Sequence, residues 1–111
     1  MIRIEQVWLS KAPLDIHAGP ESCLARVIQV FGAAKPHHAY VFLNKRSNCM
    51  KVLVHDGFGL WLGARRLHQG RFAPPKLWQG KQIELCTEQL NALTIGLPWY
   101  QVGADKSIAI L

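Results

Sequence analysis

The chain has 111 residues, half of them hydrophobic, and a formal net charge of +6. This length suffices for one hydrophobic core, so we expect a single domain over residues 1–111, and the apolar content excludes disorder throughout. No apolar run approaches the roughly 20 residues that span a bilayer. The N-terminal segment also lacks the apolar core of a signal peptide. We therefore expect a cytoplasmic protein with no membrane partner.

The positive charge is concentrated in the middle of the chain. Between Lys35 and Lys81 lie nine cations and one carboxylate, Asp56, whereas the flanks hold four cations and six carboxylates. Neutralisation of phosphates supplies most of the sequence-independent affinity for nucleic acid, so DNA is the first partner to consider. The alternative is a cationic surface that serves only solubility.

The first predicted elements are a strand and a helix. Residues 4–9 alternate in the manner of a strand, and the alternation ends at Pro13. A helix is predicted from Pro20, a residue suited to the first helical position, to Gly32, which suits a left-handed cap. Its apolar stripe at helical spacing consists of Leu24, Val27, Ile28 and Phe31.

Three further strands are predicted at residues 40–43, 49–55 and 58–62, with a polar turn over 44–48. Asp56-Gly57 between two apolar runs predicts a hairpin with a type I′ turn, which needs positive φ at both central residues. Along the middle strand, Lys51 and Leu53 should face one side of the sheet and Val52 the other.

The C-terminal part is less regular. Residues 69–75 should form a surface loop and residues 83–85 a short strand. Thr87 is a suitable N-cap for a helix that ends near Gly96, and residues 101–111 resemble a loose tail. The expected fold class is therefore α+β, with an antiparallel meander of three or more strands packed against two helices.

Cationic side chains beside the meander form the candidate nucleic-acid-binding site. Its members are Lys45, Arg46, Lys51, Arg65, Arg66 and Arg71. The first turn and the end of the third meander strand lie at one end of the sheet, so the cations at 45, 46, 65 and 66 should converge. Guanidinium groups contact phosphate in a bidentate manner, which favours this interpretation. The alternative is a sheet edge that cations protect against pairing with other sheets.

Catalysis has weaker support in the sequence. The five histidines stand at no metal-ligand spacing, and the three cysteines, Cys23, Cys49 and Cys86, include no C-x-x-C pair, so they are expected to be free and buried. A metal-dependent nuclease would need clustered carboxylates such as Asp15 and Asp56, but turn chemistry already explains Asp56. We expect no catalytic residue, metal or cofactor, and a nuclease is the weakest alternative.

Five aromatic residues allow two interpretations. Trp61, Trp78, Trp99, Phe58 and Phe72 offer stacking surfaces for unpaired bases, or they serve as core and interface anchors. The sequence favours the second interpretation without excluding the first.

The residues in order resemble a known family, the TnpB-type accessory proteins encoded by the second reading frame of IS66-type insertion elements. The resemblance lies in VWL at 7–9, PLD at 13–15, the helix end at 31–32, YVFLNKR at 40–46, KVLVHDGFGL at 51–60, RRL at 65–67, GRF at 70–72, and positions 75, 89–90, 93, 96–97 and 99. The family motif includes Asp15, Asp56 and Gly57, whose role is unknown.

The resemblance implies a protein that assists transposition alongside a separate transposase, without established catalytic activity. DNA of the element ends and the transposase are the partners it implies, and it indicates no oligomeric state. One motif differs: the family follows Asp15 with Met-Arg-Lys-Gly, whereas this chain has Ile16-His17-Ala18-Gly19. If this segment contacts phosphate in relatives, this chain should bind more weakly there or in a pH-dependent way.

Overall fold

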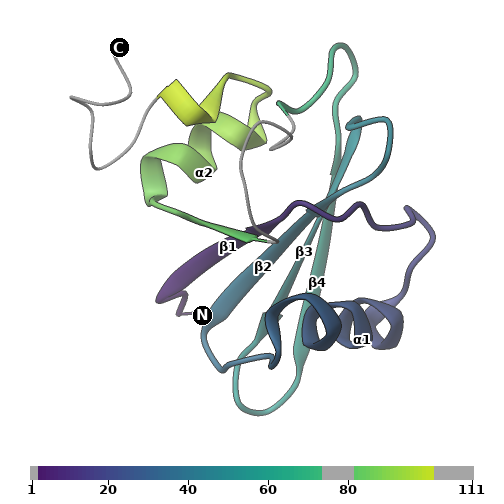
Figure 1. Ribbon diagram of the computed structural model, residues 1–111, viewed down its shortest axis with the longest axis vertical. Coiled ribbons are helices and arrows are strands. Elements are labelled where there is room, and N and C mark those ends of the chain that lie inside the picture. Colours follow the sequence, from purple (N-terminus) through teal and green to yellow (C-terminus); the bar gives the residue numbers. More distant parts are fainter. Residues whose placement is uncertain (1–2, 74–81, 102–111) are drawn as a thin grey trace.

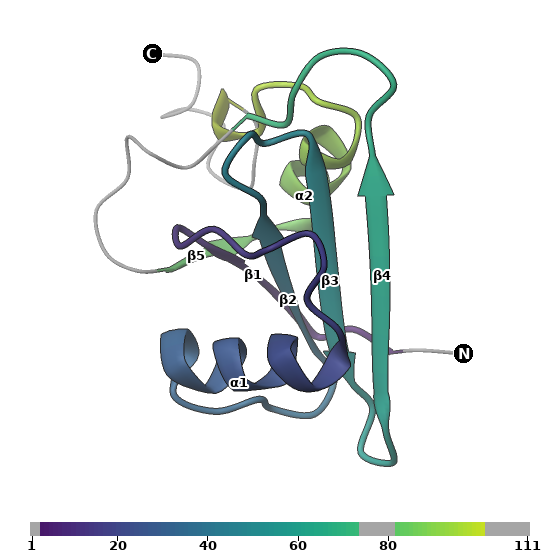
Figure 2. The same cartoon turned by 90° about the vertical axis from the view of Figure 1, so that its right-hand side faces the viewer.

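The computed structural model of the chain describes residues 3–73 and 82–101 (Figures 1 and 2). The elements are β1 (Gln6–Ser10), α1 (Pro20–Phe31), β2 (His38–Leu43), β3 (Cys49–His55), β4 (Leu60–Arg66), β5 (Gln82–Leu85), α2 (Thr87–Thr94) and the short 3₁₀ helix η1 (Trp99–Gln101). The predicted loose tail lies outside the described residues from position 102 onward, and Gln101 itself belongs to η1. The predicted loop residues 74 and 75 also lie outside.

One five-stranded sheet forms the centre of the fold, in the order β4-β3-β2-β1-β5. The meander β2–β3–β4 is antiparallel, as predicted. β1 pairs with β2 in parallel and with β5 antiparallel, so the sheet extends beyond the meander by two strands. The α+β class is confirmed, and the sheet is mostly antiparallel.

Each face of the sheet carries its own apolar core. Tyr40, Phe42 and Leu53 pack with Cys23 and Val27 of α1 on one face. On the other face, a second core joins the sheet to α2 and η1; its fully buried members are Leu9, Val41, Phe72, Leu93 and Trp99. Figure 1 shows the two helices on different sides of the strands. The predicted facing of the middle strand is confirmed, because Leu53 and Val52 belong to different cores.

The first helix forms where the sequence predicts it. Gly19 is the N-cap, Pro20 takes the first position, and Gly32 ends the helix at a φ of 86°, donating its N–H to the carbonyl of Ile28 at 2.9 Å. The second helix begins one residue before the prediction: Cys86, not Thr87, is the N-cap. The reason is Gln89, whose side chain accepts the backbone N–H of Cys86 at 3.0 Å.

The predicted hairpin is present, but its turn type was wrong. Gly57 has a φ of 92° and Asp56 is not among the residues with positive φ, so the turn is not type I′. His55 pairs with Leu60, which leaves a four-residue loop. The Asp56 carboxylate explains this loop, because it accepts the backbone N–H groups of Phe58 and Gly59, both at 2.8 Å.

The last strand of the meander also differs from the prediction, since β4 covers Leu60–Arg66 and not 58–62. Arg65 and Arg66 therefore lie within the strand and not after it. Among the described residues, no helix has the length and apolar character needed to cross a membrane.

Candidate nucleic-acid interface

Cations gather at one end of the sheet. β1 and β2 run in parallel and β2–β3–β4 form a meander, so the end of β1, the β2–β3 turn and the end of β4 lie together. The N–H of Phe72 donates to the carbonyl of Ser47 at 2.7 Å, which brings the following loop to the same end. We call this the basic end; among the residues that the structure describes, its cations are Lys11, Lys45, Arg46, Arg65, Arg66 and Arg71.

The β2–β3 turn that carries Lys45 and Arg46 is held firmly. Asn44 Oδ1 accepts the backbone N–H groups of Asn48 and Cys49, each at 3.0 Å, and Asn44 Nδ2 donates to Asn48 Oδ1 at 2.6 Å. Ser47 is nearly buried with a φ of 57°. The turn therefore presents its two cations from a fixed backbone.

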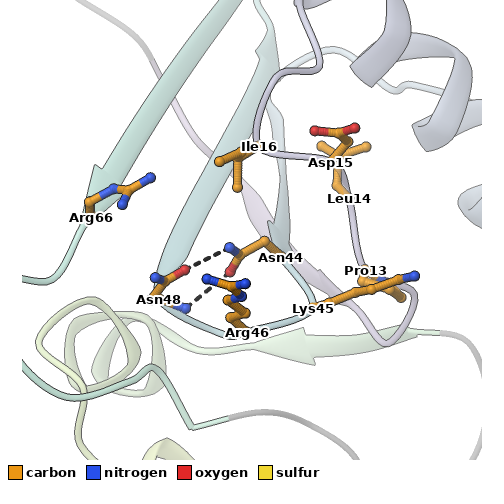
Figure 3. Close-up of a pocket in the computed structure, with 9 residues that line it drawn as sticks. All are labelled: Pro13, Leu14, Asp15, Ile16, Asn44, Lys45, Arg46, Asn48 and Arg66. Atoms are coloured by element: carbon orange, nitrogen blue, oxygen red, sulfur yellow. Dashed lines mark hydrogen bonds between the residues drawn. The ribbon is translucent and has the colours of Figure 1, made fainter.

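A hollow of about 550 Å³ opens between this turn, the end of β4 and the segment that follows β1 (Figure 3). It is lined by Pro13, Leu14, Asp15, Ile16, Asn44, Lys45, Arg46, Asn48 and Arg66. Figure 3 shows Arg46 and Arg66 directed into it from two sides, while Lys45 extends toward Pro13 at its edge. In the described part of the chain, these three cationic side chains form no hydrogen bond or ion pair, so their donors are available to a ligand.

The wall opposite the turn is built from residues 13–16. The N–H of Leu14 donates to the carbonyl of Leu43 at 3.0 Å and fixes this segment against the end of β2. Asp15 Oδ1 accepts the N–H of His17 at 2.8 Å, which gives the motif carboxylate a turn-forming role. His17 is exposed and does not line the hollow. The weaker or pH-dependent binding expected from this departure stays a prediction.

The predicted convergence holds for Arg66 and not for Arg65. Arg66 pairs with Cys49 in the sheet and lines the hollow beside Lys45 and Arg46. Arg65 projects from the opposite face, because successive strand residues alternate. Its Nε donates to the carbonyl of Thr94, at the end of α2, at 2.7 Å.

The remaining predicted cations lie outside the hollow. Lys51 Nζ donates to the carbonyl of Ala18 at 2.6 Å, so this half-buried side chain joins β3 to the start of α1. Burial raises the pKa of the neighbouring Cys23 thiol, and the charge of Lys51 partly opposes that shift. Arg71 is exposed in the loop after β4 and does not line the hollow.

Asp56 and Gly57 lie at the other end of β3, at the hairpin tip near the bottom of Figure 2. Asp56 Oδ2 also accepts the indole N–H of Trp61 at 2.8 Å. Hydrogen bonds from the backbone of Phe58, the indole and the backbone of Gly59 lower the Asp56 pKa to about 2. This carboxylate therefore organises the loop.

The nuclease alternative needs Asp15 and Asp56 close together, but they lie at opposite ends of the sheet. The seven residues of β3 separate the ends by roughly 20 Å. Among the residues that the structure describes, no three His, Cys, Asp or Glu side chains are grouped in a way that could hold a metal ion.

The aromatic residues divide into two groups. Trp99 and Phe72 are fully buried, which confirms core roles for them. Phe58 and Trp61 are exposed, but they belong to the hairpin at the far end from the hollow. Trp78 lies outside the described residues.

Sequence reasoning missed Lys11 and Ile16. Lys11 joins the basic end only because β1 runs parallel to β2, a pairing between segments about 30 residues apart. Ile16 faces the hollow from a segment without regular structure, so no periodicity marks it. The position of Lys11 directly after a predicted strand was the one available signal.

The fold and the hollow define the class of protein: a small α+β protein with a cationic surface at one end of its sheet, the basic end. The family model of "IS66 Orf2 like protein" matches residues 5–104, and the chain belongs to this family. Membership suggests an accessory protein of transposition.

Two relatives come from Sinorhizobium fredii (strain NBRC 101917 / NGR234). The uncharacterized protein y4hO is 30% identical over 95 residues, covering 85% of this chain and 82% of its own length. The uncharacterized protein y4jC is 26% identical over 99 residues, covering 87% and 83%. No solved structure matches the chain.

Proposed function

We propose that this protein assists transposition of its insertion element by binding DNA through the hollow at the basic end. The observation that carries the proposal is the meeting of Lys45, Arg46 and Arg66 around one concave surface. These cations come from a turn and from a separate strand, so the fold and not the local sequence brings them together. Two guanidinium groups without other partners in the described structure suit bidentate contact with phosphate oxygens.

The rigid backbone of the β2–β3 turn also supports the proposal. A site whose backbone is already fixed loses little conformational entropy when it binds, so more of the contact energy appears as affinity. The Asn44 and Asn48 amides provide that rigidity.

Salt dependence tests the proposal. If the three cations contact about three phosphates, the logarithm of the association constant for duplex DNA should fall against the logarithm of salt concentration with a slope near −2.7. Fluorescence anisotropy with a labelled fragment of the element end measures this slope. Absence of binding to both duplex and single-stranded DNA at low salt would overturn the proposal.

A second candidate is an adaptor that binds the transposase and makes no DNA contact. The supporting observation is a set of three exposed apolar side chains in the segment after α2: Ile95, Leu97 and Tyr100 are 60%, 50% and 37% exposed. Exposed apolar patches often serve as protein interfaces. A pull-down that offers transposase and terminal DNA separately distinguishes the candidates: retention of transposase alone, lost in Leu97→Ser, would favour the adaptor.

A further inference from the structure

We propose that the basic end holds one unpaired DNA strand, along a track from Arg66 at the end of β4 to Lys11 at the end of β1. This inference rests on the proposed DNA binding and specifies its ligand. It adds Lys11 and Ile16 to the contacting residues.

The order of the strands places the cations in a row. Arg66 ends β4, Arg46 and Lys45 lie in the turn that joins β3 to β2, and Lys11 follows β1. With neighbouring strands about 4.8 Å apart, the row from β4 to β1 covers roughly 14 Å. A single backbone lying across this end would meet the cations one after another.

Two neighbouring hollows lie at the row of cations. A second hollow, of about 210 Å³, adjoins the first and shares Pro13, Asn44 and Lys45 with it. Lys11 lines this second hollow. The two hollows are therefore neighbours, and Lys45 lines both of them.

Lys11 is held in place by its neighbours. The hydroxyl of the buried Ser10 accepts the N–H of Ala12 at 3.1 Å and lies 3.2 Å from the Ala12 carbonyl, to which it also donates. This local turn fixes the backbone on both sides of Lys11. Its cation is therefore presented from a rigid position, like those of the β2–β3 turn.

The far wall of the track carries apolar side chains beside the carboxylate of Asp15. Leu14 packs into the core beneath α1, but the half-buried Ile16 belongs to neither core cluster. Folding therefore does not account for Ile16, whose side chain lines the hollow together with Pro13. The cations on one side suit the charged backbone of a nucleotide, and the apolar carbon of Pro13 and Ile16, beside Asp15, suits its base face.

The size of the first hollow favours an unpaired strand over a duplex. A volume of about 550 Å³ falls within the ~300–1,000 Å³ range of small-ligand sites, the scale of a nucleotide. Bases of a duplex face each other and cannot enter such a hollow without leaving the stack, which costs a few kcal/mol for each nucleotide. This cost is smaller for a single strand, because its bases are already unpaired.

The test compares a labelled 12-nucleotide single strand with the duplex of the same sequence at low salt. The wild type should bind the single strand at least 5-fold more tightly, with a salt slope near −2.8 for about four phosphates. Lys11→Ala should weaken single-strand binding 3- to 10-fold. Ile16→Ala should weaken it by a similar factor but leave the salt slope unchanged, because Ile16 contacts no phosphate. The matched controls, Arg3→Ala at the other end of the sheet and Ile28→Ala on the exposed side of α1, should leave affinity unchanged.

Two results would overturn the track while leaving the proposed function intact. One is that the wild type binds the duplex as tightly as the single strand, and that Arg66→Ala weakens the binding of the duplex. The other is single-strand binding that neither Lys11→Ala nor Ile16→Ala weakens. A third result concerns charge alone: if polyglutamate competed as well as unlabelled single strand, the surface would recognise only negative charge, and the track would be overturned. Failure to bind either DNA would overturn both proposals.

Discussion

Arg65 Nε donates a hydrogen bond to the carbonyl oxygen of Thr94 at 2.7 Å, across 29 positions of sequence. This contact joins the edge strand β4 to the end of α2. It gives the two adjacent arginines of β4 different roles, because Arg66 lies on the opposite face and lines the hollow.

Arg65→Ala should therefore lower stability, while Arg66→Ala should lower DNA affinity. We expect Arg65→Ala to reduce the free energy of unfolding by about 0.5–1 kcal/mol, because its charge-assisted hydrogen bond is exposed to solvent. Arg66→Ala should change it by less than about 0.5 kcal/mol. Urea denaturation measures both. Equal stability of the two variants would contradict this division.

Lys51 should be structural. Lys51→Met keeps the apolar stem but removes the bond to the Ala18 carbonyl, so we expect a loss of about 1 kcal/mol in the free energy of unfolding. DNA affinity should stay within about twofold of the wild type, since Lys51 lies outside the hollow. A fall in affinity as large as that of Arg66→Ala would show that Lys51 contacts DNA.

The hairpin loop should respond to acid through Asp56. Its pKa is lowered from 3.8 to about 2, so its contribution to stability is complete above about pH 4 and is lost as the pH falls through 2. Asp56→Ala should lower the melting temperature at pH 7 by a few degrees. The gap between variant and wild type should close toward pH 2. A gap that is constant from pH 7 to pH 2 would show that the charge of Asp56 contributes nothing.

Gly57 should be required for its backbone conformation. Its φ of 92° disfavours any side chain, so Gly57→Ala should reduce the free energy of unfolding by about 1 kcal/mol. Gly59 is the matched control, because an added Cβ there meets nothing within 4 Å and its φ is not positive. Gly59→Ala should be as stable as the wild type or slightly more so. If both variants behaved alike, the conformation of Gly57 would not limit the loop.

Local sequence signals predicted the parts of the fold that local interactions build. Helix α1 begins at Pro20 and ends before Gly32 because both residues have backbone preferences that act without tertiary contacts. The β3–β4 hairpin follows from Asp56 and Gly57, although the carboxylate of Asp56 selects a wider loop than the dipeptide suggests.

Tertiary pairing determined what the sequence could not show. Residues Gly63 to Arg66 contain no β-branched side chain, yet they continue β4 because their backbone pairs with Cys49–Val52 of β3. Because the strand continues through Arg65 and Arg66, these two side chains lie on opposite faces of the sheet. Arg65 therefore does not line the hollow, although the sequence predicted it there. The parallel pairing of β1 with β2 likewise adds Lys11, whose position after a predicted strand did not by itself place it beside the β2–β3 turn.

The most direct test of DNA binding by the hollow is the double variant Arg46→Ala with Arg66→Ala, measured against a control of equal charge. The control, Arg3→Ala with Lys35→Ala, removes two exposed cations from the opposite end of the sheet. The hollow variant should bind duplex DNA at least 10-fold more weakly, with a salt slope reduced by about 1.8, while the control changes neither. Equal loss of affinity in both variants would mean that net charge, and not the hollow, attracts DNA.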